Sequence, residues 1–166
     1  ETIDGFMFTP RFGAGGTLWD PAEHGGRVPR AEVDAAVDEL FERFDVARFY
    51  CDPPGWRTEI EAWAARHGAE KVIEWPTYRP MPMHAALERF LSDLVEGRVD
   101  FDGCPDTYRH LTNAKVAHRK DGRYVLTKPG DGRKIDLAVA STLAHEAWGD
   151  VTNAKLWRRK YGAYSA

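Results

Sequence analysis

Two aspartates stand where the sequence predicts the ends of secondary-structure elements, and a carboxylate in such a place can contact a substrate or a metal ion. The first, Asp52, follows an apolar run at residues 46–51 and precedes Pro53 and Pro54. The run predicts a short buried parallel strand, which the prolines end. Ligands bind at the carboxyl ends of strands in open α/β sheets, so Asp52 is a candidate site residue. Shaping the turn, or capping a helix that starts near Trp56, is an equal alternative.

The second aspartate, Asp136, lies near the start of the last predicted helix, residues 134–148, which is apolar nearly all round. We therefore expect its side chain to point toward the core or into a cleft. An isolated buried carboxylate is unfavourable unless it has a partner, and a divalent cation is one such partner. An ion pair with Arg133 or Lys134 is the alternative.

Two further polar residues lie between these acids. Lys128 opens a loop over residues 128–133, from which its ammonium group could steady a phosphate or an attacking water, although a plain surface lysine is an equal alternative. For Asn113 we favour a hydrogen bond that orders a loop over a contact with DNA.

Basic residues gather in one stretch of the chain. Residues 105–134 hold eight basic residues against three acidic ones, whereas the whole chain has a net charge of −3. Asp121-Gly122 predicts a hairpin turn between residues 115–119 and 123–127, a basic β-ribbon. Such a stretch indicates a polyanion partner, with a solvated surface as the alternative. The cations that would hold backbone phosphates are Lys115, Arg119, Lys120, Arg123 and Arg133.

Helix and strand patterns alternate along the chain. A hairpin, or the end of one, is expected at residues 2–12 and a surface loop at 13–29. Helices are expected at residues 29–44, 56–67, 83–96 and 134–148, and strands at 46–51 and 71–75. A short strand or turn is expected at 99–105, and a helical turn leading into a strand at 108–117. This order predicts an α/β domain with parallel strands, residues 1–148, and a basic tail, residues 149–166.

The order of these features resembles the C-terminal nuclease domain of phage terminase large subunits, which has an RNase H-like fold. The resemblance covers about residues 2–148. It is carried by Phe49-Tyr50-Cys51-Asp52-Pro53, by Leu111-Thr112-Asn113-Ala114, and by Lys128 followed by Arg133-Lys134-Ile135-Asp136-Leu137-Ala138-Val139-Ala140.

The resemblance implies a three-layer α/β/α domain with a mixed central sheet and a basic β-ribbon before the last helix. It implies an endonuclease that cuts concatemeric double-stranded viral DNA with Mg²⁺ or Mn²⁺, two ions in the intact site. Asp52 and Asp136 would be metal ligands and Lys128 a catalytic residue. The terminase small subunit and the portal would be partners.

The chain departs from the pattern of this family at its start. Family members use three acids, the first on the opening strand of the sheet. Asp4 fits a hairpin turn better than that strand, so we expect the first acid and its strand to lie upstream of Glu1. No phosphate-binding loop of the Gly-x-x-x-x-Gly-Lys-Ser/Thr kind is present, so we expect this chain to be a fragment without the ATPase domain.

Other functions remain open at this point. The chain could be another RNase H-like nuclease of the resolvase or transposase type, or a non-catalytic module that docks on the portal or on DNA. Cys51 and Cys104 form neither a disulfide framework nor a zinc pattern, and His110, His118 and His145 lack metal-ligand spacing. With no transmembrane run and no signal peptide, we expect a soluble protein of the host cytoplasm that has no membrane partner and is not secreted.

Overall fold

The computed structural model describes residues 1–13, 16–130 and 132–154 as a mixed α/β structure. The helices are α1 (Arg30–Arg43), α2 (Arg57–His67), α3 (Pro80–Val95), α4 (Pro105–Asn113) and α5 (Asp136–Asn153), with one 3-10 turn, η1 (Pro21–Glu23). The strands are β1 (Phe6–Met7), β2 (Phe49–Cys51), β3 (Val72–Glu74), β4 (Asp100–Phe101), β5 (Lys115–His118) and β6 (Tyr124–Thr127).

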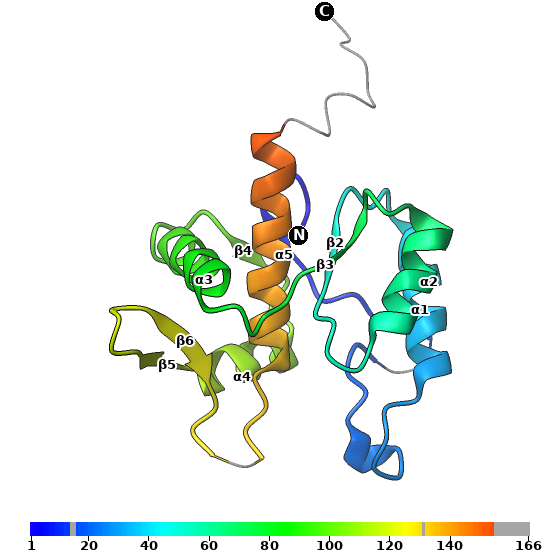
Figure 1. The fold of residues 1–166 in the computed structure, drawn as a ribbon, viewed down its shortest axis with the longest axis horizontal. Helices are drawn as coiled ribbons and strands as arrows, with labels where there is room; N and C mark the ends of the chain where they lie inside the picture. The colour runs from blue at the N-terminus through cyan, green and yellow to red at the C-terminus, as the bar shows by residue number, and fades with distance from the viewer. Residues whose placement is uncertain (14–15, 131, 155–166) are drawn as a thin grey trace, which may run out of the picture.

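The long helix α5 stands at the centre, with the other elements on two sides of it (Figure 1). On one side lie α1, α2, β2 and β3, which we call the Asp52 lobe (residues 30–77, including the segment that follows β3). On the other side lie α3, α4, β4 and the ribbon of β5 and β6. Because both sides pack on α5, the helix is buried around much of its circumference, as its nearly all-round apolar sequence predicts.

The Asp52 lobe has its own apolar core. Its buried side chains are Val37, Cys51, Ile60, Trp63 and Val72. The strands β2 and β3 pair in parallel, and α2 connects them, so the parallel pairing predicted from the alternation of helix and strand is confirmed here. A parallel pair places both strand ends, and the residues that follow them, at the same edge.

The second core lies between α3, α5 and the opening segment of the chain. Met7, Phe90 and Val99 are its buried members. The hairpin predicted at residues 2–12 is wrong, because β1 pairs in parallel with β4. Gly5 does form a tight turn in which its N–H binds the Thr2 carbonyl at 3.0 Å. The strand that follows this turn pairs with β4, which lies far along the chain, and not with the segment before the turn.

The strands form three separate two-stranded sheets within the described residues, β1–β4, β2–β3 and β5–β6. This differs from the one mixed central sheet that the resemblance implies, and the RNase H-like arrangement stays an expectation. The basic ribbon is confirmed as an antiparallel hairpin with Lys115 opposite Thr127. Gly122, with φ of 80°, makes its turn as predicted, since few side chains tolerate that conformation.

Several element bounds differ from the sequence-based expectation. The helix α3 begins at Pro80 rather than Met83, because proline is tolerated in the first turn, where backbone N–H groups lack helical partners. Residues 105–113 form the helix α4, where only a helical turn was expected. The helix α5 continues through Gly149 to Asn153, and residues 155–166 of the expected tail lie outside the described residues.

Among the described helices, none is both long enough and apolar enough to cross a membrane.

Candidate functional site

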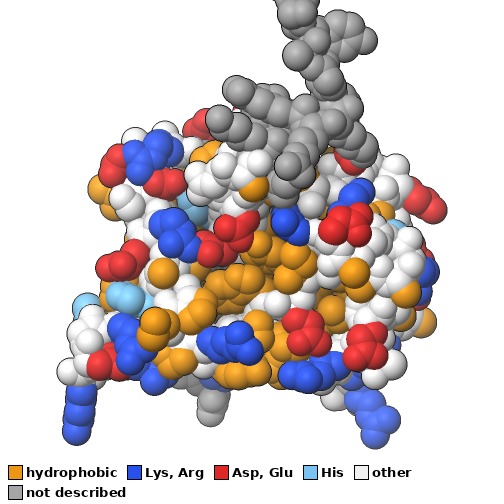
Figure 2. All heavy atoms as spheres, turned by 45° about the horizontal axis from the view of Figure 1, so that its top comes forward, with side chains coloured by type: hydrophobic (Ala, Val, Ile, Leu, Met, Phe, Trp, Pro, Cys, Tyr) orange, Lys and Arg blue, Asp and Glu red, His pale blue; other side chains and the backbone are white. Residues whose placement is uncertain are grey.

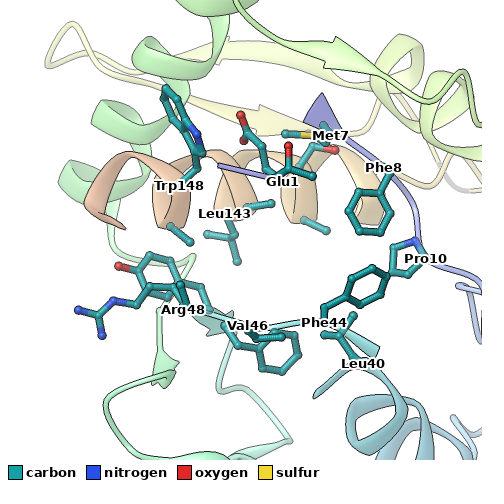
Figure 3. A pocket seen from close by; sticks show the side chains of 18 of the residues that line it. Glu1, Met7, Phe8, Pro10, Leu40, Phe44, Val46, Arg48, Leu143 and Trp148 are labelled. Atoms are coloured by element: carbon teal, nitrogen blue, oxygen red, sulfur yellow. The ribbon is translucent and has the colours of Figure 1, made fainter. Parts of the chain in front are cut away.

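A cavity of about 1480 Å³ lies between the Asp52 lobe, the opening segment and α5. Its walls are mostly apolar. Figure 2 shows hydrophobic side chains gathered in the middle of one face of the molecule. In Figure 3, Met7, Leu143 and Trp148 approach it from one side and Leu40, Phe44 and Val46 from the other. The polar side chains on its rim decide what chemistry it can support. Asp52, Thr77, Thr107 and Asp136 are among them.

Asp52 lies directly after β2, at the strand's carboxyl end, as predicted. Its Oδ1 accepts the backbone N–H of Thr77 at 3.0 Å and its Oδ2 accepts the Thr77 hydroxyl at 2.7 Å. Thr77 follows β3, so these bonds join the segments that leave two neighbouring strands. The alternative in which Asp52 caps α2 is wrong, because the residue at the N-cap is Trp56 and no side chain caps that helix.

Asp136 is the first residue of α5 and its side chain is exposed. Of the two expected places, the cleft agrees with the position of Asp136 on the cavity, whereas the core is wrong, because the helix starts two residues later than predicted and Asp136 falls in the first turn. A carboxylate there is stabilised by the positive end of the helix dipole. Asp136 borders the same cavity as Asp52, at the start of α5 rather than at a strand end.

The start of α5 is held by α4 through two side chains, which together we call the α4–α5 junction. His110 Nδ1 accepts the backbone N–H of Leu137 at 3.0 Å, and Asn113 Nδ2 donates to the Lys134 carbonyl at 3.1 Å. Burial lowers the pKa of His110, which keeps its ring neutral and its Nδ1 able to accept. The hydrogen-bonding role favoured for Asn113 agrees with this geometry.

The predicted cations lie away from the cavity wall. Lys128 and Arg133 are exposed, and neither borders the cavity. On the ribbon, Lys115, Arg119 and Lys120 are exposed, whereas Arg123 is paired with Asp121 at 2.6 Å. The Tyr124 N–H contacts His84 Nδ1 of α3 at 3.4 Å, which fixes the ribbon beside that helix.

A third acid close to the cavity already has a partner. Glu1 and Asp93 lie on either side of His145, at 3.1 Å from Nδ1 and 3.0 Å from Nε2. Burial alone would lower the pKa of His145, but these two carboxylates raise it above its ordinary value and so favour the charged form of the ring. His145 thus fastens the opening segment and α3 to α5.

The donor atoms at the cavity suit a hard divalent cation, since Mg²⁺ and Mn²⁺ prefer carboxylate oxygens. Within the described residues, however, no group of three or more His, Cys, Asp or Glu side chains is arranged to hold a metal ion. The carboxylates of Asp52 and Asp136 are therefore chemically suited to such an ion, but among the described residues they supply only two of the ligands that it needs.

Sequence reasoning missed two contacts that shape this site. Thr77 follows a strand end at the same edge as Asp52, and the rule for parallel strands that selected Asp52 could have found it. His110 lies far from Asp136 in the sequence, and no spacing rule connects a residue of one helix with the first turn of another. Its contact is visible only in three dimensions.

The chain is similar to the Gene 13 protein of Mycobacterium phage D29, with 32% identity over 155 residues, and to the Gene 13 protein of Mycobacterium phage L5, with 31% over 155 residues. Each alignment covers 83% of this chain and 25% of the relative, so the chain spans about a quarter of the length of these relatives. It matches no protein-family profile and no solved structure. The chain is therefore related to bacteriophage proteins.

Proposed function

We propose that this phage-related chain is the nuclease part of a viral DNA-packaging terminase, a divalent-metal-dependent endonuclease that cuts double-stranded DNA. The observation that carries the proposal is that Asp52 and Asp136, supplied by different elements, border one cavity. The similarity to longer phage proteins is consistent with it.

In the proposed phosphodiester hydrolysis, different residues of the chain have different roles. Asp52 and Asp136 would hold Mg²⁺ or Mn²⁺, and such ions activate water and stabilise charge on the leaving oxygen. Thr77 fixes the rotamer of Asp52 through two hydrogen bonds, leaving further lone pairs on the carboxylate for an ion. Lys128 is proposed to approach the scissile phosphate when DNA is bound.

The remaining metal ligand is proposed to come from outside the described residues, on a strand that enters the cavity. Met7 of β1 and Phe49 and Tyr50 of β2 line it, and β1 and β2 each pair on one edge only within the described residues. Protein interiors are close-packed, so an apolar space of about 1480 Å³ calls for an occupant. An extended strand would pair with these edges and carry its acid toward Asp52.

The ribbon is the proposed DNA-holding element. Its exposed Lys115, Arg119 and Lys120 offer positive charge on a rigid hairpin fixed to α3. Such contacts to phosphates give affinity without reading the base sequence. In the intact packaging machine, the small subunit and the portal are the proposed protein partners.

The test is a nicking assay on linear duplex with Mn²⁺, using the full-length protein. Asp52→Ala and Asp136→Ala should each abolish cleavage. Asp4→Asn is the matched control, since Asp4 is an exposed acid that does not line the cavity, and it should cleave like the parent. Cleavage that survives both substitutions would refute the site, and a strong preference for branched over linear duplex would favour a resolvase.

A further inference from the structure

We infer that α4 positions Asp136, with His110 and Asn113 as positioning residues that hold the backbone on both sides of this acid. The inference rests on the proposed function, because it gives these two residues a purpose only if Asp136 binds the metal ion. For His110 this is a role that the sequence did not suggest, and for Asn113 it gives the expected hydrogen bond a purpose at the site.

The two hydrogen bonds bracket Asp136 closely. Asn113 holds the carbonyl of Lys134, two residues before the acid, and His110 holds the N–H of Leu137, the residue after it. The His110 ring is only 2% exposed, so water does not compete for its Nδ1. The backbone from residue 134 to residue 137 is thereby fixed at both ends.

The first turn of α5 depends on this support. The first N–H groups of a helix have no intrahelical partner, and the N-cap here, Ile135, provides no side-chain hydrogen bond. The carbonyl of Ile135 accepts from Ala138 at 2.9 Å, but the N–H of Leu137 is satisfied by His110. A ring from α4 thus replaces the side-chain cap that the α5 sequence lacks.

The helix α4 is itself anchored to the opening segment at the cavity wall. The Thr107 hydroxyl, 4% exposed by residue, lies 2.6 Å from the Thr9 hydroxyl, and both residues line the cavity. One short helix therefore connects the wall of the site with the acid that starts α5. Residues that hydrogen-bond next to a metal ligand, as His110 and Asn113 would, orient that ligand. The loss of such residues typically reduces metal affinity about 10–100-fold.

Two substitutions of His110 distinguish the effect of its hydrogen bond to Leu137 from the effect of the space that its ring fills. His110→Leu fills a similar volume without an acceptor. His110→Asn places an amide oxygen near the position of Nδ1, so it can accept the Leu137 N–H again. Asn113→Ala is the second test site, since Asn113 is half-exposed and its truncation spares the core.

The experiment measures amide hydrogen exchange at Leu137 and the Mn²⁺ dependence of both thermal stabilisation and nicking in the full-length protein. We expect His110→Leu to speed the exchange of Leu137 and to raise the apparent Mn²⁺ constant about tenfold, with a smaller rise for Asn113→Ala. His110→Asn should recover most of both losses.

The outcomes distinguish the inference from the proposed function. If the parent protein binds Mn²⁺ through Asp136 and His110→Leu leaves the Mn²⁺ constant unchanged, or if His110→Asn is as impaired as His110→Leu, the positioning role is refuted and the proposed function stands. If the parent shows no Mn²⁺-dependent stabilisation or cleavage, the proposed function fails and the inference with it, whatever the exchange of Leu137 shows.

Discussion

The two acids of the site are held in opposite ways. In the Asp52 lobe, the carboxylate itself is bound, because both of its oxygens accept hydrogen bonds from Thr77. At the α4–α5 junction, the backbone beside Asp136 is bound by His110 and Asn113, while the carboxylate is exposed at the start of the helix. One acid is fixed through its side chain and the other through its main chain.

This difference follows from the elements that carry the acids. A strand end is already rigid, so Asp52 needs only its rotamer fixed, and a neighbouring strand can do this. A helix start frays unless its N–H groups are satisfied, so Asp136 needs its backbone fixed first. The two supports involve different elements, the segment after β3 and the helix α4, so we expect that each can be weakened separately.

The largest expected change in stability comes from a substitution in the core of the Asp52 lobe. Trp63 is 4% exposed, and its Nε1 donates to Asp34 at 2.7 Å. Trp63→Ala should lower the free energy of unfolding by about 3–5 kcal/mol, through lost packing and a cavity. Native-state hydrogen exchange should rise more in β2 and β3 than at Leu137. Equal loss of protection at both places would show that the two supports are not separable.

A smaller change removes the side-chain support of Asp52. Thr77→Val keeps the shape and the backbone N–H but deletes the hydroxyl that bonds Asp52 Oδ2 at 2.7 Å. The expected loss is about 1–2 kcal/mol in denaturant unfolding, since the bond is made to a charged group in a half-buried place. Thr112→Val is the control, because its hydroxyl donates to the Tyr108 and Arg109 carbonyls within α4. A Thr77 variant as stable as the parent would contradict the described support.

Two buried histidines, His145 on α5 and His110, which contacts the start of α5, should respond to pH in opposite directions. The pKa of His145 is raised by Glu1 and Asp93, so its contribution to stability is complete below the unfolded value of about 6.5 and is lost as pH rises through the higher folded value. The pKa of His110 is lowered by burial, so its contribution is present above about 6.5 and is lost as pH falls.

Unfolding free energies of the parent and of His145→Gln, measured from pH 5 to pH 9, test the first of these statements. The difference between the two proteins should be largest at the acid end and should shrink toward alkaline pH. The ion pair of Asp93 with Arg98 remains in both proteins and cancels in the comparison. A difference that grows with pH would show that His145 is neutral in the folded state.

The smallest expected effect on stability belongs to the ribbon, which supports neither acid. Lys115→Ala and Lys120→Ala, both at exposed positions, should change the free energy of unfolding by less than about 0.5 kcal/mol. Each should weaken DNA binding and reduce the slope of log affinity against log salt by about 1. Unchanged salt dependence would remove the ribbon from the DNA surface.

The sequence predicted those features that depend on local pattern. The strand that ends at Asp52, its parallel partner and the Asp121-Gly122 hairpin all follow from apolar runs and turn residues. The pairing of β1 with β4 was not predictable, because it joins short segments far apart in the chain. The exposure of Asp136 depended on where α5 begins, and helix starts are uncertain when the N-cap residue is apolar, as Ile135 is.

Whether Asp52 and Asp136 bind one metal site is the central question, and Mn²⁺ binding answers it most directly. Titration of Mn²⁺ into the full-length protein, followed by the loss of the free-ion electron paramagnetic resonance signal, should show binding that weakens strongly in both Asp52→Asn and Asp136→Asn. The loss of binding free energy in the double variant should differ from the sum of the two single losses, because both acids serve one site. Mn²⁺ binding that is unchanged in either single variant would contradict the account.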